Sequence, residues 1–228
     1  MKVVLYLHAG LKQRDFVGPL VCALKRVLVA PVSTREISLP FNRSMLATET
    51  QLDINKVAGQ FIQASAGGAS PTFKYLLLPY DMKPPSLNYA FASSYANPAT
   101  PYYVGIVSTA RLEASGPQPQ GQQPANVTAL RAYKLILKSI ARLAGLNSPD
   151  RCILDFPRSL PELDQKSSEF CAEDREILVS AGILKAEEQE SGDCTAVSDR
   201  RENRLFVLAA GKAHGADLFA MERDRHER

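Results

Sequence analysis

The sequence predicts an α/β domain built on a largely parallel, twisted β-sheet packed on helices. Two observations lead to this prediction. Strand-like and helix-like segments alternate along the first half of the chain, and residues 73–78 form an apolar run, interrupted by Lys74 alone, between Pro71 and Pro79. Such a run is typical of a central strand that is covered on both faces, and the alternation implies right-handed crossovers between parallel strands.

The amino-terminal half supplies the alternating elements. Residues 2–7 are rich in β-branched and aliphatic side chains and predict a first, buried strand. An amphipathic helix is expected over 16–28, a second strand over 35–39 and a second helix over 52–62. These elements, together with the central run, account for the predicted parallel core.

The second half begins with a strand and a connector of unusual composition. Residues 102–109 predict a strand, and residues 115–126, made almost wholly of Gly, Pro, Gln and Ala, predict a mobile surface loop. The strongest helical pattern runs over 128–144. Thr128 is placed to cap this helix and Gly145 to end it.

The carboxyl-terminal part is predicted to be helical and then charged. Ser159 and Glu162 have capping-box spacing, and a further helix is expected over 172–181. Beyond Leu184 the pattern weakens into a mixed charged stretch. The chain therefore divides into a domain over 1–184 and a charged extension over 185–228.

Composition excludes several classes of function. The chain has 27 Lys and Arg against 24 Asp and Glu, a formal charge of +3 that is too small and too dispersed to predict nucleic-acid binding. No apolar run is long enough to cross a membrane. The apolar start lacks a cleavage pattern for secretion, so the four cysteines are expected to be reduced thiols in an intracellular, cytoplasmic protein.

Short motifs then resemble a known family. The segments Cys152-Ile-Leu-Asp-Phe156 and Phe170-Cys171-Ala-Glu-Asp174 follow a helix that ends in Leu143-Ala-Gly145-Leu146. This order resembles the archaemetzincins, zinc metallopeptidases of the metzincin clan. Upstream, Ile106–Leu112 looks like the edge-strand signature of the family, and Leu87–Phe91 like the segment before it. The resemblance covers residues 1–184 and implies a metzincin-like mixed sheet with one antiparallel edge strand.

The chemistry of that family lies in the motif H-E-x-x-H-x-x-G-x-x-H-C. Its histidines hold Zn²⁺, and its glutamate acts as general base on the bound water. With the glycine of the motif placed at Gly145, the resemblance implies a vestigial active-site helix over 128–145. The two helical histidines, the glutamate and the third histidine are replaced by Lys138, Arg142, Ser139 and Ser148. The chain has no histidine between His8 and His214, so no shift of register restores the motif.

The resemblance also implies a second, structural zinc held by four cysteines. Only Cys152 and Cys171 remain, while Pro149 and Asp174 stand at the other two positions. Two thiolates cannot complete a tetrahedral site, although Asp174 as a third ligand, or Cys194 or His214 folding back, stays open. We therefore expect no metal and no other cofactor, with Cys152 and Cys171 as remnant buried thiols.

Two cations on one helix face predict a local ion pair. Lys138 and Arg142 share a face of the helix, and buried cations are costly unless paired. The acids close by in the family arrangement include Asp155 and Asp174, so we expect a salt bridge from at least one of the cations to a carboxylate.

The sequence thus predicts a catalytically inactive, archaemetzincin-like pseudopeptidase, not an enzyme, that acts as a protein-binding or structural module. Its candidate binding surface is an exposed edge strand that other chains can pair with, or that the 115–126 loop merely covers, made of Gly105, Ile106, Val107, Ser108, Thr109, Ala110 and Arg111. Gly105 marks a bulge or a close approach in this strand. The alternatives are a structural subunit of a large assembly and a residual metallopeptidase with a non-standard site. A protein partner or a large complex is expected, and neither a membrane nor a nucleic acid.

Overall fold

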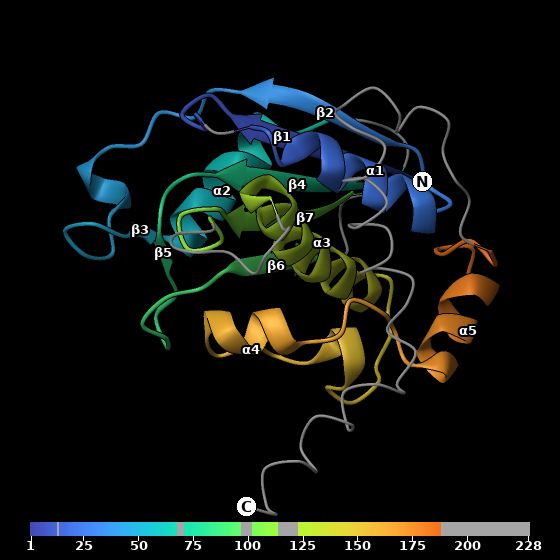
Figure 1. The fold of residues 1–228 in the computed structure, drawn as a ribbon. Helices are drawn as coiled ribbons and strands as arrows, with labels where there is room; N and C mark the ends of the chain where they lie inside the picture. The colour runs from blue at the N-terminus through green and yellow to red at the C-terminus, as the bar shows by residue number, and fades with distance from the viewer. Residues whose placement is uncertain (13, 68–70, 97–101, 114–122, 188–228) are drawn as a thin grey trace, which may run out of the picture.

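The structure is a computed structural model that describes residues 1–12, 14–67, 71–96, 102–113 and 123–187 (Figure 1). Most of the predicted 115–126 loop and nearly all of the predicted 185–228 extension lie outside the described residues. The predicted boundary at residue 184 is therefore still a prediction. Up to that boundary and just beyond it the chain stays attached to the domain, because the Lys185 amide donates to the carbonyl of Val27 at 2.9 Å.

A five-stranded sheet forms the centre of the molecule and confirms the predicted fold class. Its order is β2-β1-β4-β7-β6, in which the first four strands are parallel and β6 runs antiparallel to β7. The strands span Lys2–His8 (β1), Val32–Ile37 (β2), Thr72–Leu78 (β4), Ala92–Ala96 (β6) and Tyr102–Ser108 (β7). The single antiparallel strand lies at one edge, as the family resemblance implied.

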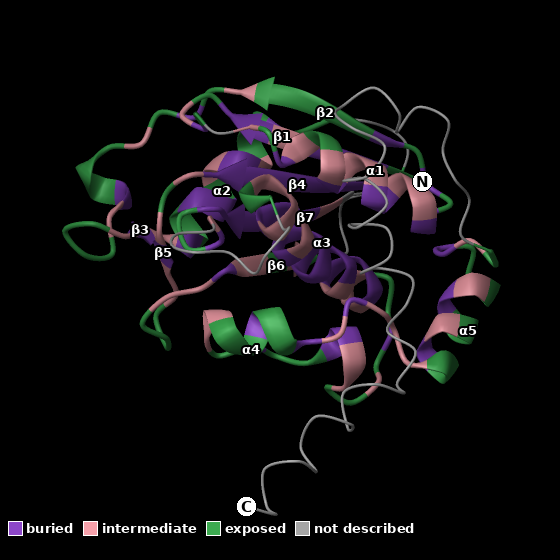
Figure 2. Ribbon diagram, viewed as in Figure 1, coloured by how far each residue is buried: buried purple, intermediate pink, exposed green. Residues whose placement is uncertain are grey.

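Helices cover both faces of this sheet (Figures 1 and 2). The core that includes α1 (Val17–Val27) and α3 (Pro124–Leu143) takes Phe73, Tyr75 and Leu77 from β4. The core that includes α2 (Ile54–Ala64) takes Leu76 and Leu78 from the same strand. Every residue of β4 is buried, which is why its sequence is apolar except at Thr72 and Lys74 instead of alternating between apolar and polar.

Smaller elements complete the domain. Two-residue strands β3 (Leu52–Asp53) and β5 (Met82–Lys83) pair in parallel. The remaining elements are the 3₁₀ turns η1 (Arg43–Met45) and η2 (Cys152–Leu154) and the helices α4 (Leu160–Gln165) and α5 (Ala172–Ser180). The predicted cap of α4 is confirmed, because the Ser159 hydroxyl accepts a hydrogen bond from the Glu162 amide.

The start of α3 differs from the prediction. The helix begins at Pro124, with Gln123 at its cap position, so it extends into the Gly, Pro and Gln-rich segment. Proline is well accommodated in a first helical turn, since its nitrogen needs no partner there. Thr128 is consequently buried inside the helix, where its hydroxyl donates to the Leu112 carbonyl at 3.3 Å. The end is as predicted: Gly145 follows the helix with a φ of +96°.

Among the described residues, no helix is both long enough and apolar enough to cross a membrane.

Candidate functional site

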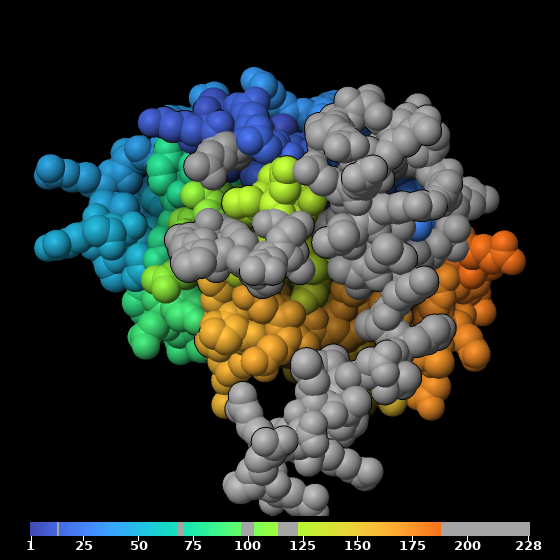
Figure 3. Space-filling view, in the orientation of Figure 1, coloured from blue at the N-terminus to red at the C-terminus, as the bar shows by residue number. Residues whose placement is uncertain are grey.

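A cleft of about 570 Å³ lies between the edge of the sheet and α3. One wall is the segment 84–94, which leads into β6, and the opposite wall is the turn 156–158 before α4. The floor comes from α3, through Leu135, Lys138, Ser139 and Arg142. In Figure 3 the residues of the two walls lie side by side at the lower left of the molecule, in green and orange. The cleft therefore contains three of the four positions that the sequence singled out.

The edge strand beside the cleft is β6, so the predicted edge over Gly105–Arg111 is corrected. Strand β7, which includes Gly105 to Ser108, pairs with β4 on one side and with β6 on the other, and Thr109 is fully buried. Ala110 and Arg111 follow the strand in a turn. The apolar pattern of β7 comes from its central place in the sheet, which leaves it no free backbone edge.

The pattern of hydrogen bonds between β6 and β7 shows which backbone groups of β6 point away from the sheet. The Ser108 amide donates to the Phe91 carbonyl at 2.9 Å, which makes this a hydrogen-bonded pair. Such pairs alternate in antiparallel ladders, so the N–H and C=O groups of Ala92 and Ser94 point away from β7. Ala90 has the same phase and donates outward to the Met82 carbonyl at 2.9 Å. Within the described residues, the free edge therefore begins at Ala92.

Two cations on the floor share one carboxylate. Arg142 Nη2 lies 2.8 Å from Asp150 Oδ1, and Lys138 Nζ lies 3.8 Å from the same oxygen. Lys138 also donates to the Asp155 backbone carbonyl at 3.1 Å. Burial, more than any neighbouring charge, lowers the pKa of Lys138. The expected salt bridge to a carboxylate is confirmed, and its acceptor is Asp150, an acid that the sequence analysis did not name.

A hydrogen bond from the central sheet positions Ser139. The buried phenol of Tyr75 donates to Ser139 Oγ at 2.8 Å. A side chain at Gly105 would place its Cβ 2.1 Å from the Tyr75 ring, so only glycine leaves room for this ring. Burial raises the pKa of Tyr75, which keeps the phenol protonated and able to donate. The close approach predicted at Gly105 is thus confirmed.

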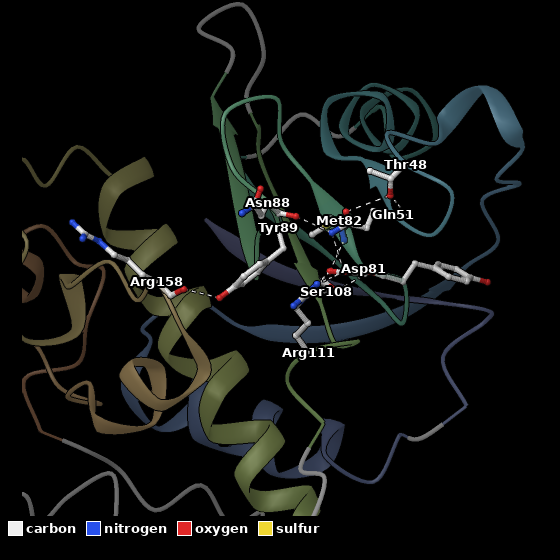
Figure 4. A network of polar contacts seen from close by, with 10 residues as sticks. Thr48, Gln51, Asp81, Met82, Asn88, Tyr89, Ser108, Arg111 and Arg158 are labelled. Atoms are coloured by element: carbon white, nitrogen blue, oxygen red, sulfur yellow. Dashed lines mark hydrogen bonds and ion pairs between the residues drawn. The ribbon is translucent and has the colours of Figure 1, made fainter.

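A polar network fixes the wall that precedes β6 (Figure 4). Arg111 donates to both carboxylate oxygens of Asp81, at 2.8 and 2.6 Å, and its guanidinium lies 4.1 Å above the Tyr89 ring. Gln51 donates to Asp81 at 3.0 Å and to the Asn88 carbonyl at 2.9 Å. These contacts hold the wall segment in one conformation.

The two walls are connected at one end of the cleft. The Tyr89 hydroxyl donates to the backbone carbonyl of Arg158 at 2.6 Å, as Figure 4 shows. The Arg158 amide in turn donates to Glu162 at 2.7 Å. Tyr89 therefore sets the distance between the wall before β6 and the turn before α4.

Ser148, the fourth predicted position, lies outside the cleft lining. Its hydroxyl donates to Asp174, which is fully buried at the start of α5. Arg151 approaches the other oxygen of Asp174 at 3.5 Å. Ser148 and Asp174 therefore connect the turn after α3 to α5.

Cys152 and Cys171 form a disulfide, so the prediction of remnant thiols is wrong. The bond links η2 to the residue that precedes α5, across 19 positions of sequence. Cys22 is disulfide-bonded as well. Because disulfides persist in oxidising compartments, these bonds count against the predicted cytoplasmic location.

A zinc ion does not fit the residues found at the motif positions. Lys138 and Arg142 are cations, and Ser139 offers a hydroxyl that already accepts a hydrogen bond. No group of three or more His, Cys, Asp or Glu side chains suited to a metal occurs in the part of the chain that the structure describes. His8 is a structural histidine: its Nδ1 accepts from the Gly10 amide, so its Nε2 donates to the Leu39 carbonyl at 3.1 Å.

Sequence reasoning missed three features of the site. Ala92–Ala96 has no β-branched residue, so it gave no strand signal beyond its place next to a predicted strand. Tyr75 looked like one more apolar residue of a central strand. Asp150 lies in a turn, where only the nearby Lys138 and Arg142 hinted at an acidic partner.

Comparison with known proteins identifies the fold. No family model matches the chain, and no curated protein matches it. An archaemetzincin structure from Methanopyrus kandleri has a TM-score of 0.59 and 20% identity, covering 78% of this chain and 94% of that one. An archaemetzincin from Archaeoglobus fulgidus, complexed with malonate, has a TM-score of 0.56 and 17% identity, covering 77% and 99%. A zinc-dependent peptidase from Methanocorpusculum labreanum has a TM-score of 0.54 and 21% identity, also covering 77% and 99%.

The chain therefore has an archaemetzincin-like fold. The same comparison contradicts the prediction that the protein is not an enzyme. All three structures are named as archaemetzincins or as a zinc-dependent peptidase, so the likeness points toward an enzyme.

Proposed function

We propose that the cleft binds an extended polypeptide segment, which pairs with β6 as an additional strand. The observation that carries this proposal is the outward direction of the Ala92 and Ser94 backbone groups along the wall of the cleft. A free strand edge binds an extended peptide through main-chain hydrogen bonds, which need no particular sequence.

The lining of the cleft supports a peptide as the ligand. Leu87 and Phe156, on opposite walls, are 44% and 56% exposed, so both walls present a large apolar side chain to a ligand in the cleft. Tyr89 and Phe91 add aromatic surface to the first wall. In a strand successive side chains point to opposite faces, so alternate side chains of a bound peptide would contact this apolar surface.

Peptide binding is also the first step of peptide hydrolysis, the activity named for the zinc-dependent peptidase among the three similar structures. Hydrolysis of the bound segment is a second candidate, favoured by the names of the three similar structures. We derive no hydrolytic step, because zinc does not fit Lys138, Ser139 and Arg142. A partner protein that presents such a segment, alone or within a larger assembly, is the occupant we propose.

The proposal is tested with a proline substitution on the free edge. Ser94→Pro removes the outward N–H, and binding of a fluorescent peptide of about six residues, an ordinary strand length, is expected to weaken about tenfold or more. Ser94→Ala keeps that N–H and is the matched control, with unchanged affinity expected. Fluorescence polarisation measures binding, and circular dichroism confirms that both variants are folded.

Two further readouts separate the candidate functions. Mass spectrometry of the incubated peptide detects cleavage, and analytical size-exclusion chromatography with a candidate partner detects assembly. Equal peptide affinity of Ser94→Pro and the unchanged protein would show that β6 is not the binding edge.

A further inference from the structure

The charged residues that line the cleft all have the same sign. Lys138, Arg142 and Arg158 contribute to the lining, and no Asp or Glu does so in the part of the chain that the structure describes. The remaining lining is apolar or neutral. Such a surface favours a ligand with negative charge.

The charges behind the floor leave this positive charge only partly balanced. Lys138, Arg142 and Lys166 lie around the carboxylates of Asp150 and Asp155. Arg142 uses its guanidinium on groups of the chain itself: Asp150 and the carbonyls of Leu146 and Ser148. The pairing is therefore closest for Arg142 and weaker for Lys138.

Lys138 keeps donor capacity on its ammonium. It has three N–H bonds, and its described acceptors are the Asp155 carbonyl at 3.1 Å and Asp150 at 3.8 Å. Its side chain is 18% exposed and lies along the Phe156 ring, with Nζ 5.2 Å from the ring centroid. At least one N–H is thus available on a largely desolvated cation, where an ion pair is stronger than in water.

Ser139, the next residue, has a donor to spare as well. Its oxygen accepts the hydrogen of Tyr75, so its own hydroxyl hydrogen is not needed for that contact. Ser139 lines the cleft floor beside Lys138. The floor therefore presents one ammonium and one hydroxyl to the same space.

We infer that the floor of the cleft recognises a carboxylate of the bound peptide, with Lys138 as the anchoring cation and Ser139 as a second hydrogen-bond donor. This inference rests on the proposed function and adds the chemistry of the partner. A carboxylate accepts hydrogen bonds on both oxygens, which matches two donors. It is supplied by a peptide carboxyl terminus or by an Asp or Glu side chain.

Four N-acetylated probe peptides with alternating Leu and Ser test the inference. The first has a free carboxyl terminus and the second a carboxamide; the third and fourth are carboxamides with a central Glu or Gln. A carboxylate is expected to improve the dissociation constant about tenfold, the usual effect of a hydrogen bond to a charged group. A gain for the first peptide alone identifies a terminal carboxylate, and a gain for the third alone identifies a side chain.

Variants assign the effect to Lys138. Lys138→Met is expected to abolish the preference for the carboxylate while the carboxamide peptide keeps its affinity, and Lys138→Arg is expected to retain the preference. Lys12→Met removes the same charge from an exposed position outside the cleft and is the matched control. If Lys138→Met does not fold, the salt dependence of the unchanged protein serves instead, since added salt should reduce only the carboxylate preference.

The outcomes separate the two proposals. Equal affinity for all four peptides overturns carboxylate recognition and leaves peptide binding intact. No binding of any peptide overturns both. A carboxylate preference that persists in Lys138→Met overturns the assignment to Lys138.

Discussion

The phenol of Tyr75 donates a 2.8 Å hydrogen bond to Oγ of Ser139, and through it the central strand of the sheet positions the floor of the cleft. Tyr75 is fully buried on β4, and Ser139 is on α3, which packs over that face of the sheet. The contact depends on Gly105 of the neighbouring strand, because any larger residue would meet the Tyr75 ring. Three segments that are distant in sequence thus determine the orientation of one hydroxyl.

Gly105→Ala is expected to lower the free energy of unfolding by about 1 to 3 kcal/mol, the usual cost of overpacking a core. The added Cβ would lie 2.1 Å from the ring of Tyr75, so the ring must move. Gly59→Ala is the matched control: its Cβ meets nothing within 4 Å on an exposed helix face, and alanine should stabilise the helix by about 0.5 to 1 kcal/mol. Denaturant unfolding measures both, and a neutral Gly105→Ala would contradict the close packing.

Tyr75→Phe tests the hydrogen bond without disturbing the packing. Loss of the hydrogen bond is expected to lower the free energy of unfolding by about 1 kcal/mol, since the Ser139 hydroxyl is buried and loses its donor. Tyr80→Phe, at a 40% exposed position, is the control and should be nearly neutral. Thermal unfolding of the two variants gives the comparison, in which equal midpoints would show that the Tyr75 contact contributes nothing.

The disulfide predicts a stability that depends on oxidation. Replacing both Cys152 and Cys171 by alanine is expected to cost about 3 kcal/mol, because a crosslink that closes a loop of this size restricts the unfolded chain. Alkylation of the unreduced, denatured protein followed by mass spectrometry checks the bond itself. Labelling of both cysteines under those conditions would show that the disulfide does not form.

The parallel core could be predicted from the sequence because burial on both faces leaves an unmistakable pattern. Strand β4 is apolar except at Thr72 and Lys74, and β1 except at its two ends, which identified both strands within a residue or two. Strand β2 was misplaced, expected at 35–39 and found at Val32–Ile37, because it lies at the other edge and residues 33–36 are exposed and polar. An edge strand with one solvated side has little pattern to read.

The site was predicted in part, and for a specific reason. The positions of Lys138, Ser139 and Arg142 were implied by the family resemblance, with the motif glycine placed at Gly145. Helical spacing added that Lys138 and Arg142 share one face of the helix. The edge strand was assigned to β7 instead of β6, because the family resemblance placed the edge-strand signature on Ile106–Leu112, and the sequence alone does not show which strands lie on either side of it. The acceptor Asp150 and the Tyr75 contact depend on how distant segments meet, which no local pattern records.

Two buried lysines with different surroundings give the last prediction. Lys166 is 7% exposed and its ammonium has no hydrogen-bond partner among the described residues, whereas Lys134 donates to the carbonyls of Leu163 and Asp164, both at 2.9 Å. Burial, with the charges of Lys138 and Lys134, lowers the pKa of Lys166 to about 7. Lys166→Met should therefore stabilise the protein by about 1 to 2 kcal/mol at pH 6, because an unpaired buried charge is removed. Lys134→Met is the matched comparison and should destabilise it, since two buried carbonyls lose their donor.

The pH dependence of this effect has a definite sign. Between pH 7 and about 10.5, the ordinary lysine pKa, the unfolded chain binds a proton at Lys166 that the folded chain does not. The free energy of unfolding of the unchanged protein therefore rises with pH in this range, because the cost of burying Lys166 decreases. The advantage of Lys166→Met should accordingly be full below pH 7 and shrink as the pH approaches 10. Denaturant unfolding of the unchanged protein and of Lys166→Met at pH 6, 8 and 9.5 measures this advantage. An advantage that stays constant over this range would mean that Lys166 keeps its proton in the fold, and that its ammonium has an acceptor in solution.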